Sequence, residues 1–165
     1  MTKSLYIKMT QWFKHHPAAY KMLYFIYKYL PMVFMAAYPL MLIYKAVFSL
    51  DRGILNLLIV PPCVFLSVTV MRKLINRRRP YEKFCTPSVI EKNREGCSFP
   101  SRHTASAFII ALCGYTLWLP LGIALTFLAL FIGLSRILAG VHFISDVLFA
   151  CVYSVLLGVV FFFII

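Results

Sequence analysis

The residue types best suited to chemistry in this sequence are a histidine and an aspartate four positions apart. At that spacing His142 and Asp146 share a face if both lie at the start of one helix. A carboxylate beside one imidazole nitrogen fixes the tautomer and leaves the other nitrogen free to attack an electrophile. Asp146 is also the only acidic residue inside an apolar span, where ionisable groups are usually functional. The alternative is a buried pair that only holds two helices together.

Two neighbouring segments carry groups that could bind an anion. Arg136 lies six residues before His142, and arginine presents a planar fork of donors to phosphate oxygens. Taken alone, Arg136 could simply extend to the membrane interface. Ser101, in Pro100-Ser101-Arg102-His103, is a natural N-cap, and a helix N-terminus favours an anion. His103 could then donate a proton to a leaving oxygen.

A third basic segment precedes these. Arg72 and Arg79 are seven residues apart and share a helix face if the helix continues between them, whereas Lys73 is one position off that face. Pro80 is expected to stop this helix. Arg77-Arg78 is interpreted as flanking charge or as a contact to lipid headgroups.

The elements that must position these groups are membrane helices. The chain has 165 residues, 62% of them hydrophobic, with a mean hydropathy of +0.84, which is more apolar surface than a soluble domain of this size could bury. The formal net charge is +12, which suits an anionic substrate or membrane surface better than nucleic acid, because the basic residues do not lie on a soluble module.

The apolar runs predict an all-α, polytopic bundle of about five spans, with six possible. The N-terminal residues 4–16 are expected either to form a helix in the membrane interface or to be a frayed polar tail. Residues 45–53 are expected to connect the first two spans, and Pro61-Pro62 should kink the second. The predicted spans are 24–46, 54–71, 103–118, 120–138 and 143–165. Two short helices in place of the first span are the weaker alternative.

This order of spans has a geometric consequence. The second span ends at Arg72 and the third begins at His103 on the same side, and the next two cross the membrane out and back. Arg136 and His142 therefore return to the side of Arg72, so every candidate polar residue is expected at one membrane face.

Together the three segments resemble the type-2 phosphatidic acid phosphatase family. Its signature is a lysine, six residues and Arg-Pro, then Pro-Ser-Gly-His, then Ser-Arg, five residues, a histidine, three residues and an aspartate. Here the third motif is complete, from Ser135-Arg136 to Asp146. Arg72 stands in place of the lysine of the first motif, and Arg102 in place of the glycine of the second. An arginine at 102 would be strained if that position needed a positive φ.

The resemblance implies the role of each residue. His142 would be a nucleophile that forms a phosphohistidine, oriented by Asp146, and His103 would protonate the leaving group and then activate water. The phosphoryl group would be bound by five residues, with Lys73 as a possible substitute for the first: Arg72, Arg79, Ser101, Arg102 and Arg136. The family needs no metal, and the sequence has no carboxylate cluster suited to Mg²⁺. No cofactor is expected.

The expected function is therefore metal-independent hydrolysis of a phosphate monoester or pyrophosphate on a membrane lipid. Candidate substrates are polyprenyl pyrophosphate, phosphatidylglycerophosphate and phosphatidic acid, and the sequence does not choose among them. Vanadate-dependent haloperoxidases carry similar motifs but are soluble. A carrier or flippase that only binds lipid phosphates is the alternative.

The chain is expected to be one integral-membrane domain, 1–165, with an interfacial segment at 1–20 and a site-face loop at 72–102. Its partners are expected to be lipids, not nucleic acid, and its oligomeric state is open. The excess of basic residues at the site face points to the cytoplasm, whereas the family resemblance points to the outer face of the cell membrane. Cys85 and Cys97 could form a disulfide in the site-face loop, which would also require an oxidising side. The outer face is the expectation.

Overall fold

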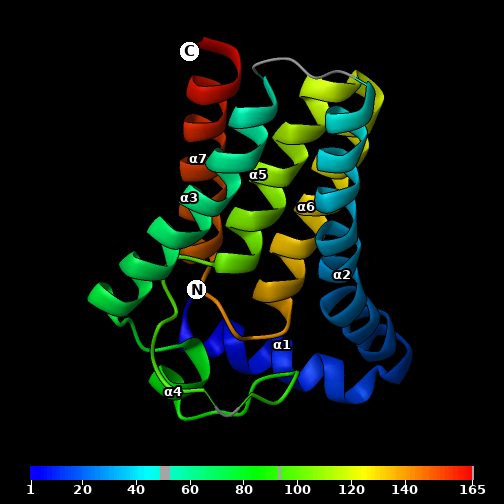
Figure 1. Ribbon diagram of the computed structural model, residues 1–165. Helices are drawn as coiled ribbons and strands as arrows, with labels where there is room; N and C mark the ends of the chain where they lie inside the picture. The colour runs from blue at the N-terminus through cyan, green and yellow to red at the C-terminus, as the bar shows by residue number, and fades with distance from the viewer. Residues whose placement is uncertain (49–52, 93, 165) are drawn as a thin grey trace.

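The computed structural model describes residues 1–48, 53–92 and 94–164 and confirms an all-helical membrane protein. Five helices run side by side along the long axis of the molecule (Figure 1). They are α2 (Pro17–Phe48), α3 (Gly53–Ile75), α5 (Arg102–Leu117), α6 (Leu119–Leu138) and α7 (Ile144–Val159). A π-helical turn, η1 (Val160–Ile164), continues α7. Ile165, the last residue of the predicted span 143–165, lies outside the described residues.

Four of the helical segments in the described part of the chain are long and apolar enough to cross a membrane. They begin at Pro17, Gly53, Leu119 and Ile144. The predicted span at 103–118 corresponds to α5, which has 16 residues and is therefore about 24 Å long, shorter than the hydrocarbon core of about 30 Å. A short helix is tolerated at this position because α5 contacts α2, α3, α6 and α7 and is shielded by them.

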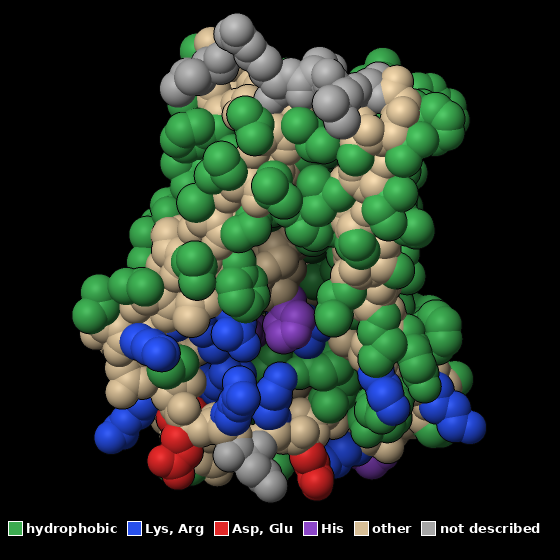
Figure 2. All heavy atoms as spheres, viewed as in Figure 1, with side chains coloured by type: hydrophobic (Ala, Val, Ile, Leu, Met, Phe, Trp, Pro, Cys, Tyr) green, Lys and Arg blue, Asp and Glu red, His purple; other side chains and the backbone are tan. Residues whose placement is uncertain are grey.

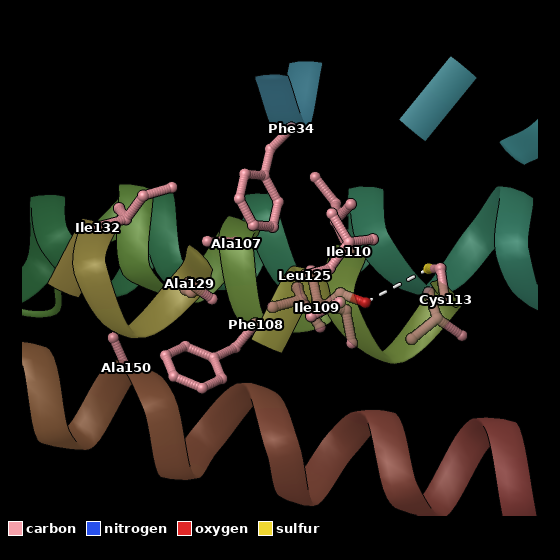
Figure 3. Close-up of a cluster of buried hydrophobic side chains, with 14 of the residues drawn as sticks. Phe34, Ala107, Phe108, Ile109, Ile110, Cys113, Leu125, Ala129, Ile132 and Ala150 are labelled. Atoms are coloured by element: carbon pink, nitrogen blue, oxygen red, sulfur yellow. Dashed lines mark hydrogen bonds between the residues drawn. The ribbon is translucent and has the colours of Figure 1, made fainter. Parts of the chain in front are cut away.

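The core of the bundle is built around α5. Ala107, Phe108 and Ile109 of α5 are buried among residues from its neighbours, such as Phe34 of α2 and Ala150 of α7 (Figure 3). Small residues on facing helices permit close approach: a Cβ added at Gly114 of α5 would lie 3.1 Å from the backbone of α6. This tight hairpin turns at Trp118, as the sequence predicts.

The N-terminal residues form a helix rather than a frayed tail. Helix α1 (Lys3–His15) lies across one end of the bundle, as an interfacial helix would (Figure 1). Its fully buried Tyr6 packs against Phe84 at 5.4 Å between ring centroids and donates a hydrogen bond to the Gly140 carbonyl. The face with Leu5 and Trp12 stays exposed. Helix α1 therefore supports the turn between α6 and α7.

Helix α2 is one continuous element, so the alternative of two short spans is wrong. Pro31 and Pro39 lie inside it, as Pro61-Pro62 lie inside α3. The predicted connection at 45–53 overlaps both helices, because α2 extends to Phe48 and α3 begins at Gly53. Residues 49–52 lie outside the described residues.

Candidate active site

The first basic segment does not form one helix. Helix α3 ends at Ile75, where Asn76 adopts a positive φ of 41°, so Arg72 and Arg79 do not share a helix face. Arg79 instead precedes α4 (Pro80–Phe84), and Pro80 begins that short helix rather than stopping α3. A proline fits there because the first turn of a helix needs no N–H donor from it.

Both arginines nevertheless reach the same place, because the loop folds back. Arg72 is buried and its Nη1 donates to the Pro100 carbonyl at 2.8 Å, while the buried Arg79 donates from Nε to the Gly96 carbonyl at 3.0 Å. Lys73 is exposed and does not line the cavity that the arginines line. The structure therefore gives Lys73 no place in the site.

Arg102 is the first residue of α5 and has ordinary helical geometry, so the strain expected for an arginine in place of glycine is absent. Ser101 occupies the N-cap position, but its hydroxyl pairs with the Thr104 hydroxyl at 2.9 Å instead of capping the helix. The Ser101 N–H donates to the Asp146 carbonyl at 3.0 Å. Ser101 thus links α5 to the start of α7.

His142 lies in the turn between α6 and α7, not in a helix as expected. The Arg136 carbonyl accepts from the Val141 and His142 N–H groups at 3.3 Å, and Gly140 has a φ of +76° that favours glycine. The guanidinium of Arg136 is 3.9 Å from the Tyr27 ring centroid and donates to the Tyr27 carbonyl. Its buried Nε has no hydrogen-bond partner among the described residues.

Asp146 is fully buried and connects the three segments. Its Oδ2 accepts from the Phe143 N–H at 2.9 Å and from the Ser98 hydroxyl at 2.5 Å, and Arg77 Nη1 lies 2.7 Å from Oδ1. His142 Nδ1 is 3.6 Å from Oδ2, close but beyond a normal hydrogen bond, and has no other partner in the described chain. The carboxylate is therefore held in place by groups other than the imidazole.

Six predicted residues line one narrow cavity at one end of the bundle, which agrees with their expected convergence. They are Arg72, Arg79, Arg102, His103, Arg136 and His142. Figure 2 shows a histidine at the base of a hollow, with Lys and Arg side chains below it and apolar side chains above. In the described part of the chain, no three His, Cys, Asp or Glu side chains form a group that could hold a metal ion.

Sequence reasoning missed five polar residues at this site. Ser98 and Arg77 hold Asp146, and three other polar residues line the cavity: Tyr27, Lys92 and Arg94. Arg77 was expected to be flanking charge, but it forms an ion pair with Asp146 and lies 4.4 Å from the Phe143 ring centroid. Only its position two residues before Arg79 could have indicated this role.

The two thiols in the site-face loop are not joined. Cys85 and Cys97 are both free, and the Cys97 thiol donates to Asn76 Oδ1 at 3.5 Å. The disulfide that would have favoured the outer membrane face is absent, so it lends no support to that orientation.

Comparison with known proteins places this site in a family. Residues 53–165 match the family model for the PAP2 superfamily, which is more than half of the chain. The fold is similar to that of a PAP2-type phosphatidylglycerolphosphate phosphatase from Bacillus subtilis, with a TM-score of 0.61 and 21% identity over 95% of this chain and 90% of that one. It is also similar to Aquifex aeolicus LpxE, with a TM-score of 0.60 and 24% identity over 86% and 92% of the two chains.

The fold and the site thus define a helical integral membrane protein with a polar cavity at one end of the bundle. The chain belongs to the PAP2 superfamily.

Proposed function

We propose that this protein hydrolyses a phosphate ester or pyrophosphate on a membrane lipid, without a metal ion, through a phosphohistidine. The observation that carries the proposal is that two cavities lie next to each other. The cationic cavity shares Arg102 and His103 with an apolar cavity of about 230 Å³ between α2, α3 and α5. A headgroup phosphate in the first and a lipid tail in the second would use both.

The reaction proceeds in two steps on the chain's own residues. In the first, neutral His142 Nε2 attacks phosphorus while the bond to the leaving oxygen breaks, and protonated His103 gives that oxygen its proton. In the second, neutral His103 takes a proton from water, the hydroxide attacks the phosphohistidine, and inorganic phosphate leaves. Arg72, Arg79 and Arg136, with Ser101 and the Arg102 N–H, stabilise the charge on the phosphoryl oxygens.

The ring orientation of His142 supports this assignment. Because Nδ1 faces Asp146, Nε2 is the nitrogen left for the cavity that His142 lines. The carboxylate would stabilise the ring as positive charge develops during attack. Catalytic hydrogen bonds are often long before a substrate binds. The distance of 3.6 Å between His142 Nδ1 and Asp146 Oδ2 is therefore expected to shorten when a phosphate is bound.

The direct test is phosphate release by the purified protein in detergent with EDTA, from a panel of lipid phosphates. We expect turnover of at least one, and inhibition by vanadate, which imitates the trigonal-bipyramidal transition state. No release from any of them would refute the proposal. A carrier or flippase remains the second candidate because Arg72, Arg79 and Arg136 could bind headgroups without chemistry.

The pKa of His142 predicts the acid limb of the pH profile of kcat/KM. Burial lowers the pKa of His142 to about 4, and the Asp146 carboxylate opposes this only in part. Since the neutral imidazole is the nucleophile, the acid limb of kcat/KM should have its midpoint at about pH 4. At higher pH kcat/KM should fall again, because the first step also needs a protonated His103. The midpoint of this acid limb should be the same for lipid phosphates with different pKa values, because it reports a group of the protein and not of the substrate. A limb near 6.5 for all of them would show that His142 keeps the ordinary pKa of histidine.

We also propose that residues 1–165 form one domain in the cell membrane, with 1–20 in the interface and the site-face loop 72–102 on the extracytoplasmic side. Cys85 is exposed in this loop and therefore reports its side. A membrane-impermeant maleimide should label Cys85 in intact cells, and a Cys85→Ser variant gives the background from the other thiols. Labelling only after permeabilisation would place the site in the cytoplasm.

A further inference from the structure

Arg102 lies where the two cavities meet. It lines both the cationic cavity and the apolar one, as only His103 does besides. Its guanidinium lies 5.3 Å from the centroid of the Phe65 ring on α3, a contact that holds the side chain at the wall of the apolar cavity. A lipid phosphate that occupied both cavities would therefore pass Arg102.

The charge at this junction is not balanced by the described protein. The residues that line the cationic cavity include six Lys or Arg side chains and no carboxylate. Asp146 is paired with Arg77, and the Glu82 carboxylate accepts from the Gly96 N–H at 2.9 and 3.1 Å. Among the described residues, none of the ion pairs that the acidic side chains form includes Arg102.

Position 102 is unfavourable for a cation unless an anion lies beside it. Arg102 is in the first turn of α5, a 16-residue helix with no acidic residue in that turn, and the helix dipole there disfavours positive charge. Independently, the Nε atom of Arg136 is buried, lacks a described partner and belongs to a side chain that lines the same cavity. A single phosphate on Arg72, Arg79 and Arg136 would leave Arg102 without a counter-charge.

We infer that Arg102 binds a second phosphate, located between the attacked phosphate and the lipid tail. The inference rests on the proposed function and narrows its substrate to lipids whose headgroup carries two phosphates. Such a headgroup is either a lipid diphosphate or a phosphodiester that ends in a phosphomonoester. In both, His142 attacks the terminal phosphorus, and His103 protonates the oxygen that stays with the inner phosphate or its alcohol.

The test compares kcat/KM for two-phosphate and one-phosphate lipids with matched tails: a prenyl diphosphate against a prenyl monophosphate, and phosphatidylglycerophosphate against phosphatidate. The wild type should prefer two phosphates, and Arg102→Gln should reduce that preference about tenfold or more, as expected for a lost hydrogen bond to a charged group. Arg102→Gln should lower activity on one-phosphate lipids by a smaller factor than activity on two-phosphate lipids, and Arg102→Lys should retain part of the preference. The prenyl and phosphatidyl pairs show which headgroup is used.

Lys92 provides the matched control, because it lines the cationic cavity but not the apolar one and donates to the Tyr27 hydroxyl at 2.9 Å. Lys92→Met should lower activity on both lipid classes to the same extent. Equal losses on both classes for Arg102→Gln, or a wild type that prefers one phosphate, would overturn the inference.

A binding measurement separates this inference from the proposed function. In a His142→Ala background, a prenyl methylenediphosphonate should bind about tenfold more weakly after Arg102→Gln, whereas a prenyl phosphonate should not. If no lipid is hydrolysed but this difference is found, the proposed reaction fails and the two-phosphate site stands. If hydrolysis occurs without any such difference, the inference fails and the reaction stands.

Discussion

Replacing His142 by alanine is expected to abolish phosphate release, with kcat lowered by about 10⁴-fold or more, because loss of a covalent nucleophile removes the reaction path itself. The measurement is single-turnover phosphate release with the lipid substrate in excess of its KM. Wild-type protein quenched in alkali should carry a base-stable, acid-labile phosphoryl group, and the variant should carry none.

Two controls make this result specific. His15→Ala changes an exposed histidine of α1, away from the cavity, and should leave kcat unaltered. His142→Gln keeps more of the side-chain volume, which matters because His142 is 3% exposed and a cavity left by alanine could disturb packing. A folded His142→Gln variant with more than a tenth of wild-type turnover would exclude a phosphohistidine. Retained lipid transfer by such variants would favour the carrier.

Asp146→Asn is expected to lower kcat by about 10²- to 10⁴-fold with little change in KM, because the amide keeps the shape but cannot stabilise a positively charged imidazole. The substitution should also destabilise the fold. The Asp146 carboxylate is the ion-pair partner of Arg77 and accepts from Ser98 and the Phe143 N–H, so an amide in its place also loosens the loop. Thermal unfolding in detergent should therefore show a lower midpoint.

Partner variants separate these two effects. Ser98→Ala removes one donor to Asp146 but leaves its charge, so unfolding should occur at lower temperature while kcat falls by less than about tenfold. Arg77→Gln removes the competing cation, so the carboxylate acts more strongly on His142 and the acid limb of kcat/KM should move to higher pH. An unchanged limb would mean that Asp146 does not act through His142.

The arrangement of helices could be predicted from the sequence because apolar length and periodicity are local properties. A membrane span must satisfy its own backbone hydrogen bonds and is therefore helical. An uncharged run such as 104–134, with Pro120 near its middle, is too long for one span and favours a hairpin of two helices. The same reasoning placed Arg72, His103, Arg136 and His142 at one end, since each adjoins the end of a span.

The loop could not be predicted in this way. Asn76 at positive φ ends α3, and Pro80 then begins a new helix, so the seven-residue spacing of Arg72 and Arg79 did not indicate a shared helix face. The helical spacing of His142 and Asp146 was misleading in the same way, because α7 begins only at Ile144.

The sequence by itself determined the residue types of the site and their gathering at one end of the bundle, because motif spacing and span order depend on neighbours along the chain. Only the tertiary structure decided which group each of them meets. Contacts such as Arg77 with Asp146, 69 residues apart, and Tyr27 with Arg136, 109 residues apart, depend on how the loop and α2 fold over the turn at Gly140. Charge and shape fix such pairings in three dimensions, and no spacing along the chain encodes them.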